Sequence, residues 1–139
     1  TFPLGIESVD GEFLVRDPIK AVGDALVCVG EVPENAAVYL LKGEAAGLIA
    51  AAAEAATSAC SQRALRLAGE PADAPLALVF DCISRVLFLD DAFADELNAI
   101  GGALPDAQCM IGALTLGEIA SSRRGLIELM NKSTLVSLY

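Results

Sequence analysis

Histidine and tryptophan are both absent from this chain of 139 residues. Without histidine the chain has no Ser-His-Asp or Cys-His group for nucleophilic catalysis, and it lacks the commonest protein ligand of zinc and haem. The sequence also contains no glycine-rich phosphate loop and no GxSxG or HExxH pattern. We therefore expect a protein without enzymatic activity, without a metal site and without a cofactor.

Basic residues are scarce. The chain has 9 Lys and Arg residues against 19 Asp and Glu residues, which gives a formal net charge of −10. Such a charge repels phosphate groups, so we expect neither nucleic acid nor a membrane as a partner. The longest apolar run spans residues 45–53, much shorter than the roughly 20 residues of a membrane span. Because no secretory signal pattern is present either, we expect a cytoplasmic location.

Closely spaced cysteine pairs are missing as well. Metal-binding and redox cysteines usually form C-x-x-C pairs, and small disulfide-bonded domains contain a higher share of cysteine. We therefore expect four reduced and mostly buried thiols, at Cys28, Cys60, Cys82 and Cys109.

The first forty residues alternate short apolar runs with turn residues, which predicts antiparallel strands. Asp10-Gly11, Gly23-Asp24 and the segment 33–35 are the expected turns. Residues 44–68 are rich in alanine and other helix formers and predict one long helix. Its alanine-rich surface favours plain packing against a sheet, with a flat dimerisation face as the alternative.

The second half predicts a strand–helix–strand unit. Residues 76–82 form a continuous apolar run, which indicates a central strand buried on both faces. An amphipathic helix follows over 90–104, with Asp90 or Asp91 as its cap, and 109–120 has strand character. A turn at 121–125 leads to one or two final strands. This order predicts one α+β domain with a mixed, largely antiparallel sheet and two main helices packed mostly on one face.

Charged residues interrupt the apolar run at the end of the predicted central strand. We expect the strand to end near Phe80 and the segment from Asp81 to Arg85 to form a loop, where α/β-type sheets often bind ligands. Arg85 is able to clamp a ligand carboxylate or to pair with Asp81. Cys82 suits a buried core thiol, or a nucleophile whose pKa Arg85 lowers.

Gly117 and Glu118 follow the next predicted strand. Glu118 is able to accept a ligand ammonium group or to remain a solvated side chain. If the two strands are parallel, Asp81, Arg85 and Glu118 gather at one sheet edge, with both signs of charge that a zwitterion such as an amino acid requires. Arg16 and Asp17 are expected to form a weak local ion pair.

Several short motifs resemble, in their order and spacing, the FIST C-terminal domain. They are PLGI near the start, FLVR followed by Asp-Pro, FDC with an arginine three residues later, LGEIA, and the terminal NKSTLVSLY. The resemblance covers nearly the whole chain. It implies one FIST C-like domain over residues 1–139, in the C-terminal part of a longer protein that also has a FIST N-terminal domain.

FIST domains are regarded as sensory domains of signal transduction that bind small ligands, with amino acids as the expected class. Some FIST proteins bind haem, for which this chain offers no histidine. Two residues depart from the family pattern, since Ser84 replaces a common glycine and Leu116 replaces a common aromatic residue. The resemblance implies ligand-binding roles for Asp81, Cys82, Arg85, Gly117 and Glu118, with Asn131 and Thr134 as further motif residues.

The resemblance therefore implies a cytoplasmic sensory domain that binds an amino acid or a related small molecule. The alternative is a protein-interaction or dimerisation module without a ligand of its own, which includes a homodimer. In that case the alanine-rich helix and the terminal strands would form the contact surface.

Overall fold

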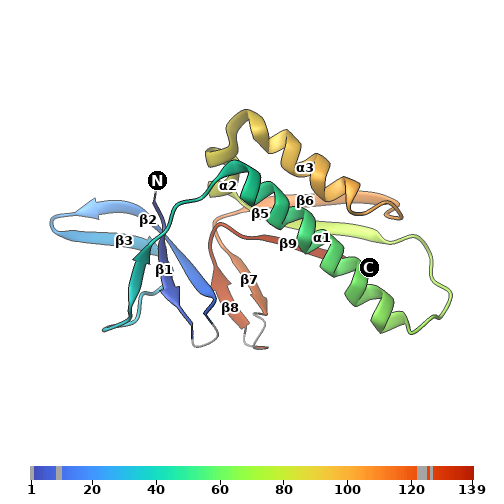
Figure 1. Ribbon diagram of the computed structural model, residues 1–139, viewed down its shortest axis with the longest axis horizontal. Coiled ribbons are helices and arrows are strands. Elements are labelled where there is room, and N and C mark those ends of the chain that lie inside the picture. The colour runs from blue at the N-terminus through green and yellow to red at the C-terminus, as the bar shows by residue number, and fades with distance from the viewer. Residues whose placement is uncertain (1, 9–10, 122–124, 126) are drawn as a thin grey trace.

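A computed structural model describes residues 2–8, 11–121, 125 and 127–139 of the chain (Figure 1). Its elements, in chain order, are β1 (Leu4–Glu7), β2 (Phe13–Val22), β3 (Ala25–Val29), β4 (Val38–Leu40), α1 (Ala45–Leu67), β5 (Leu76–Cys82), α2 (Ile83–Leu89), the 3₁₀ turn η1 (Asp90–Ala92), α3 (Phe93–Gly102), β6 (Cys109–Thr115), β7 (Glu118–Ser121), β8 (Ile127–Met130) and β9 (Thr134–Leu138).

The predicted α+β class is confirmed, and the described strands are divided among three sheets. The first sheet has the order β3-β2-β1-β4, the central sheet has the order β6-β5-β9, and β7 pairs with β8. Among the described strands β5 and β6 form the one parallel pair, and the other pairs are antiparallel. The right-handed crossover expected between these two strands contains α2 and α3.

The first sheet is built from the predicted short runs. Gly23 and Asn35 have left-handed backbones, with φ of 58° and 62°, at two of the expected turns. Pro18 lies in β2 where the register with β3 shifts, which is a position where a strand tolerates a residue without an N–H. Asp10 of the third expected turn, and residues 122–124 of the turn predicted at 121–125, lie outside the described residues.

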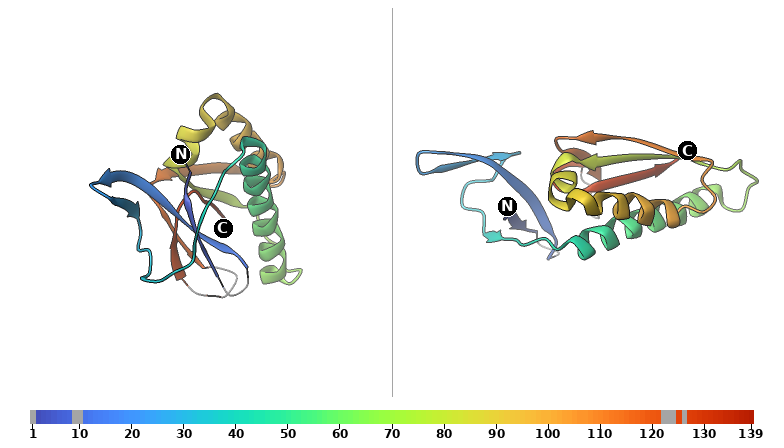
Figure 2. Two further views of the ribbon diagram at one scale, coloured as in Figure 1. Left: turned by 60° about the vertical axis from the view of Figure 1, so that its left-hand side comes forward. Right: turned by 90° about the horizontal axis from the view of Figure 1, so that it is seen from above.

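Helices α1 and α3 lie side by side on one face of the central sheet, as predicted (Figure 2). Ala52, Ala56 and Ala59 of α1 are buried in this layer. Because alanine has a short side chain, the helix axis comes close to the sheet. The helix ends where Ala68 and Gly69 adopt left-handed backbones, at φ of 49° and 87°.

The central position of β5 is confirmed, but the prediction that it is buried on both faces is wrong. Ala77 and Val79 are buried beneath the helices, whereas Phe80, on the opposite face, is 38% exposed. Residues 76–80 of the strand are all apolar, and the described part of the chain covers one face of the strand with helices. The other face presents apolar side chains to the surface.

The loop predicted from Asp81 to Arg85 is also wrong. Asp81 and Cys82 are the last residues of β5, and α2 begins at the next residue. No loop is needed to bring these charges to solvent, because Arg85 lies four residues after Asp81 and pairs with its carboxylate.

Three other boundaries differ from the predictions. The helix expected from residue 90 begins at Phe93, after η1, and its N-terminus has no side-chain cap. The run over 109–120 divides into β6 and β7 beside Gly117, whose φ is 144°. The final segment forms two strands that are separated at Lys132, whose φ is 56°.

Candidate functional site

The residues singled out in the sequence lie mainly in a buried polar cluster at the end of β5. Asp81, Arg85 and Glu96 are 2%, 3% and 0% exposed. Arg85 Nε lies 3.3 Å from Asp81 Oδ1 and donates to Glu96 Oε1 at 3.2 Å. Arg85 Nη2 forms a second, close ion pair with Glu96 Oε2. The guanidinium therefore joins β5, α2 and α3.

Arg85 also donates to two backbone carbonyls. Its Nη2 donates to the Leu48 carbonyl of α1 at 2.8 Å, and its Nη1 donates to the Lys132 carbonyl at 3.2 Å. The fork of the side chain is thus engaged by protein groups on several sides. Of the two roles that the sequence allowed for Arg85, pairing with Asp81 is the one present in this structure.

Two carboxyl groups and one guanidinium share this buried space. Burial, followed by the hydrogen bond and the charge of Glu96, raises the pKa of Asp81 from 3.8 to about 7, against the opposing effects of Thr134 and Arg85. Asp81 Oδ2 is buried and accepts no hydrogen bond from a donor of the described residues. Protonation of Asp81 would relieve this oxygen and leave the cluster neutral.

A second buried polar group surrounds Glu118 at the start of β7. Glu118 is 2% exposed and accepts hydrogen bonds from the hydroxyl groups of Thr115 and Ser133, each at 2.6 Å. The amide of Cys82 donates to the Ser133 carbonyl at 3.1 Å. Glu118 is therefore not a solvated side chain, because it is buried and each of its oxygens accepts a hydrogen bond from a hydroxyl group of the protein; its role as an acceptor for a ligand ammonium group stays a prediction.

Gly117 allows the chain to turn tightly beside this group. A Cβ on Gly117 would lie 3.1 Å from Asn131 Nδ2, and its left-handed φ of 144° disfavours other residues. The glycine thus brings β7 against the segment that connects β8 to β9.

The first sheet is joined to β8 by Arg16 and Asp17. Arg16 donates to the carbonyls of Glu31 at 2.8 Å and Leu129 at 2.9 Å, and its burial lowers the pKa of the guanidinium. The Arg16–Asp17 ion pair predicted from the sequence is wrong, because Asp17 instead pairs with Lys132, at 3.1 Å between Oδ2 and Nζ. Both side chains therefore cross the junction between the two halves of the molecule.

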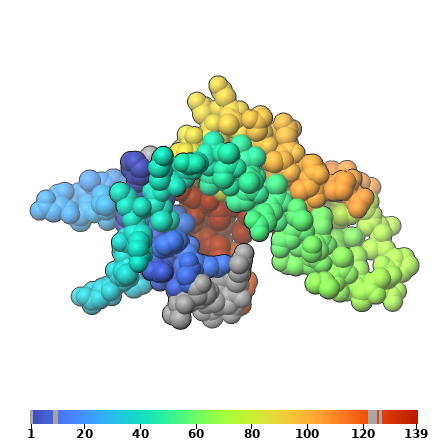
Figure 3. All heavy atoms as spheres, viewed as in Figure 1, coloured from blue at the N-terminus to red at the C-terminus, as the bar shows by residue number. Residues whose placement is uncertain are grey.

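A hollow of about 180 Å³ lies at this junction. Side chains of both charge signs line it, among them Glu128 and Lys132. In Figure 3 the red C-terminal strands are seen at the bottom of a depression between the blue first strands and the green α1. The lining residues are Ser8, Glu12, Phe13, Leu14, Val15, Glu128, Met130, Asn131, Lys132 and Ser133.

The structure brings the five predicted ligand residues near one another without joining all of them. Asp81 contacts Arg85, whereas Glu118 is linked to β5 through Ser133 and Cys82. None of the five lines the hollow at the junction, and their contact with a ligand stays a prediction. Two of them bind residues that line the hollow. Arg85 donates a hydrogen bond to the Lys132 carbonyl, and Glu118 accepts one from the Ser133 hydroxyl.

Sequence reasoning missed Glu96 and Lys132. A signal for Glu96 was present, because it shares a helix face with Phe93 and Ile100, at spacings of three and four residues within an apolar stripe. A charged residue on such a face indicates a buried partner. For Lys132 the signal was its place between the motif residues Asn131 and Thr134.

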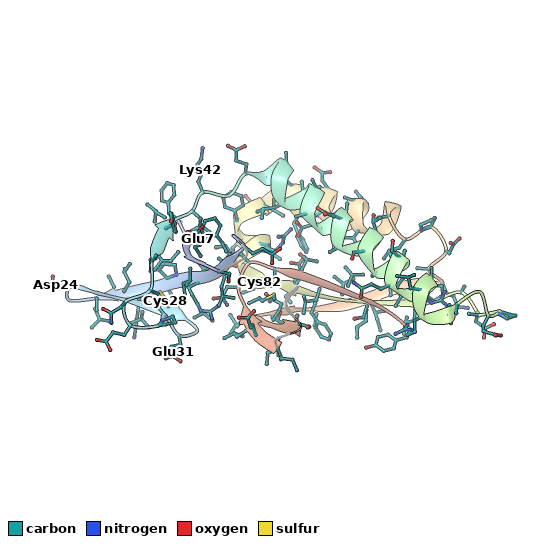
Figure 4. The ribbon with its side chains drawn as sticks, turned by 60° about the horizontal axis from the view of Figure 1, so that its bottom comes forward. Glu7, Asp24, Cys28, Glu31, Lys42 and Cys82 are labelled. Atoms are coloured by element: carbon teal, nitrogen blue, oxygen red, sulfur yellow. The ribbon has the colours of Figure 1, made fainter. Side chains whose placement is uncertain are left out.

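All four cysteines are free, as predicted, but they are not mostly buried. Cys82 is buried, Cys28 and Cys60 are partly exposed, and Cys109 is exposed. Figure 4 shows Cys82 close to the junction and Cys28 in the first sheet. The Cys82 sulfur lies 3.0 Å from the Ser84 hydroxyl, which is compatible with the expected core thiol.

One family model matches most of this chain. The model of the FIST C domain covers residues 1–121. The chain belongs to the FIST C domain family. This family consists of signal-transduction sensory domains. No match was found among curated proteins or among solved structures.

The match to the FIST C model includes some of the candidate site residues and leaves out others. Asp81, Arg85 and Glu118 lie within the matched residues, whereas Lys132 and Ser133 lie beyond them. Across the described ranges no group of three or more candidate metal ligands is present. No helix in the described part of the FIST C chain has the length and apolar character needed to cross a membrane.

Proposed function

We propose that this FIST C domain senses a small zwitterionic ligand, an amino acid or a related molecule, in the cytoplasm and without catalysis. The observation that carries the proposal is the hollow at the junction, which has both signs of charge in its lining. Its volume of about 180 Å³ suits a small amino acid. Glu128 suits the ligand ammonium group, and Lys132 suits the carboxylate.

Lys132 is the residue through which binding would reach the rest of the molecule. Its ammonium group pairs with Asp17 of the first sheet, and its carbonyl accepts from Arg85 of the central half. A ligand carboxylate that competes for the ammonium group would weaken the link to Asp17. A sensory response then follows as a change in how firmly the two halves are held together.

The predicted ligand residues act in this proposal as positioning residues. Arg85, held by Asp81, fixes the backbone of Lys132, and Glu118 fixes the hydroxyl of Ser133. Gly117 allows Asn131 to approach, and the amide of Cys82 holds the Ser133 carbonyl. The buried polar cluster would thus define the shape of the hollow without touching the ligand.

A thermal-shift screen against amino acids and related small acids tests the proposal. A ligand present at about 100 times its dissociation constant adds about 2.7 kcal/mol to the stability of the folded state. We expect a hit that disappears in Lys132→Met, which keeps the apolar stem but removes the ammonium group. Lys42→Met is the matched control, because Lys42 is an exposed lysine that pairs with Glu44.

Three results would contradict this assignment. Unchanged binding in Lys132→Met would remove the hollow from the proposal. The absence of any hit for this chain, followed by a hit when a FIST N-terminal domain is joined to it, would move the site to a surface shared by both domains. The absence of a hit in both forms would favour the alternative of a protein-interaction module. The exposed apolar face of the central sheet is consistent with that alternative.

A further inference from the structure

Strand β6 forms an unprotected edge of the central sheet. It pairs with β5 on one side, and no described strand pairs with its other side. Such an edge presents a row of unpaired backbone N–H and C=O groups to any strand that approaches. Natural edges are usually protected by charge, proline or a bulge, but residues 107–117 contain neither a charged residue nor a proline.

An apolar hollow of about 290 Å³ runs beside this edge, on the side of the helices. Phe93 and Leu97 of α3 form one wall, and Met110 and Leu114 of β6 form the other. Met110 and Leu114 are 37% and 50% exposed, so the edge is incompletely covered. An added strand would therefore find backbone partners and, next to them, room for its alternate side chains.

We propose that the occupant is β6 of a second copy of this chain, paired antiparallel across a two-fold axis at Gly112. In this register Met110 of each copy lies opposite Leu114 of the partner subunit, and both face the hollow. Ile111 lies opposite Ala113 of the partner subunit on the other face. The strand is self-complementary because its single central glycine, Gly112, separates large apolar residues at equal distances on either side.

Charge favours this edge over the edges formed by β3 and β9. Two copies with a net charge of −10 each repel one another over most approaches. The edge strand β3 is flanked by Asp24 and Glu31, and β9 begins beside Lys132, whereas β6 lies in an uncharged stretch. The result is a six-stranded sheet with the order β9-β5-β6-β6-β5-β9, in which each copy contributes three strands. The interface goes beyond the ligand-sensing function and does not depend on it.

Sedimentation equilibrium at several protein concentrations tests the proposal. We expect a reversible dimer that Ile111→Lys weakens by roughly tenfold or more, since a charge then stands at the centre of the pairing edge. Ile111 is 54% exposed, so the variant should still fold, and circular dichroism checks this. If it does not fold, Ala113→Lys places the same charge at another exposed position of β6.

Leu65→Lys is the matched control. Leu65 is an apolar side chain on α1 with 81% exposure, on the helix that would form the contact surface in the alternative interpretation of the sequence. We expect this variant to dimerise as the unmodified chain does. Raising the salt concentration from about 0.05 M to about 0.5 M should strengthen the dimer, because salt screens the repulsion between two acidic copies that meet at an uncharged edge.

Amide hydrogen exchange gives a second measurement. Protection of residues 109–115 should increase with protein concentration in the unmodified chain and should not do so in Ile111→Lys. A chain that stays monomeric at all concentrations would overturn the proposal. So would a dimer that Leu65→Lys disrupts and Ile111→Lys leaves intact.

Discussion

Arg85 compensates two buried carboxyl groups with one positive charge. Asp81 and Glu96 both contact its guanidinium group, and all three side chains are nearly inaccessible to water. An unpaired charge in such a place is costly, so the cluster is most stable when one of the two carboxyl groups is protonated. The stability of the fold is thereby linked to pH through Asp81.

The sign of this linkage follows from the direction of the pKa shift. The pKa of Asp81 rises from 3.8 to about 7 in the folded state, so the folded state binds more protons than the unfolded state between these values. The free energy of unfolding should therefore fall as the pH rises from about 4 to about 7, by an amount on the order of 4 kcal/mol from this group. Urea unfolding at several pH values measures it.

Asp81→Asn isolates this contribution. The amide stays neutral at every pH, so the variant should gain stability relative to the unmodified chain as the pH rises from 5 to 8. Asp91→Asn, on the exposed surface, should leave the profile unchanged. Parallel profiles for the unmodified chain and Asp81→Asn would show that the cluster does not take up a proton on folding.

Removal of Arg85 should be among the most damaging single changes in this domain. Arg85→Ala leaves Asp81 and Glu96 buried without their cation, which typically costs about 3–5 kcal/mol. Arg85→Lys keeps the charge but loses the planar fork, so we expect a smaller loss. Lys42→Ala breaks an exposed pair and should change the free energy of unfolding by at most about 0.5 kcal/mol. Equal losses for Arg85→Ala and Lys42→Ala would contradict the structural role of the cluster.

At the scale of elements, the alanines of α1 set the distance between the helix and the central sheet. Ala56 is fully buried, whereas Ala51 lies on the exposed side of the same helix. Ala56→Leu forces extra volume into this contact and should destabilise the fold by about 1–3 kcal/mol. Ala51→Leu should change stability by less than about 0.5 kcal/mol. Both variants change the helix propensity by the same amount. A difference between their thermal unfolding midpoints therefore reports the effect of packing.

Elements with local signals were predicted well from the sequence. Helix α1 and the strands of the first sheet have propensity, periodicity and turn residues within their own segments. Helix α2 was missed because its stability depends on Arg85 reaching Glu96, which lies in another element. The division between β6 and β7 was missed because Gly117 acts through its contact with the distant Asn131.

The candidate site was predictable only in part, because it also depends on contacts between residues that are distant in the sequence. The sequence identified Asp81, Arg85 and Glu118 because they are charges at the ends of apolar runs. It did not show that Arg85 and Glu118 already hydrogen-bond to groups of the protein, or that Asp81 pairs with Arg85. Whether a polar residue faces a ligand or another side chain depends on tertiary contacts, which have no local pattern.

At the scale of the whole molecule, two halves meet across a polar junction. The first sheet contacts the rest through Arg16 and through the Asp17–Lys132 pair, close to the hollow described above. Buried polar links of this kind are directional, so they define one relative placement of the halves. The junction is therefore expected to be the least stable boundary in the molecule.

Arg16→Met tests this view. The variant leaves the carbonyls of Glu31 and Leu129 without their buried donor, which should cost about 1–3 kcal/mol. Amide hydrogen exchange should show faster exchange in β1–β4 and little change in α1 and β5. Uniformly faster exchange across all elements would mean that the two halves unfold as one unit.

The position of β9 has a consequence for biosynthesis. This strand is the last described element, yet it pairs along β5 in the middle of the chain, and the Lys132 carbonyl just before it completes the contacts of Arg85. The first sheet involves residues 4–40, which all precede the strands of the central sheet in the chain. The central sheet is completed only after residue 138 has left the ribosome. Until Lys132 has been added, the hydrogen bonds of Arg85 are incomplete. A nascent chain that stalls between these points would hold a finished first sheet and an unfinished core, and would be a ready substrate for chaperones.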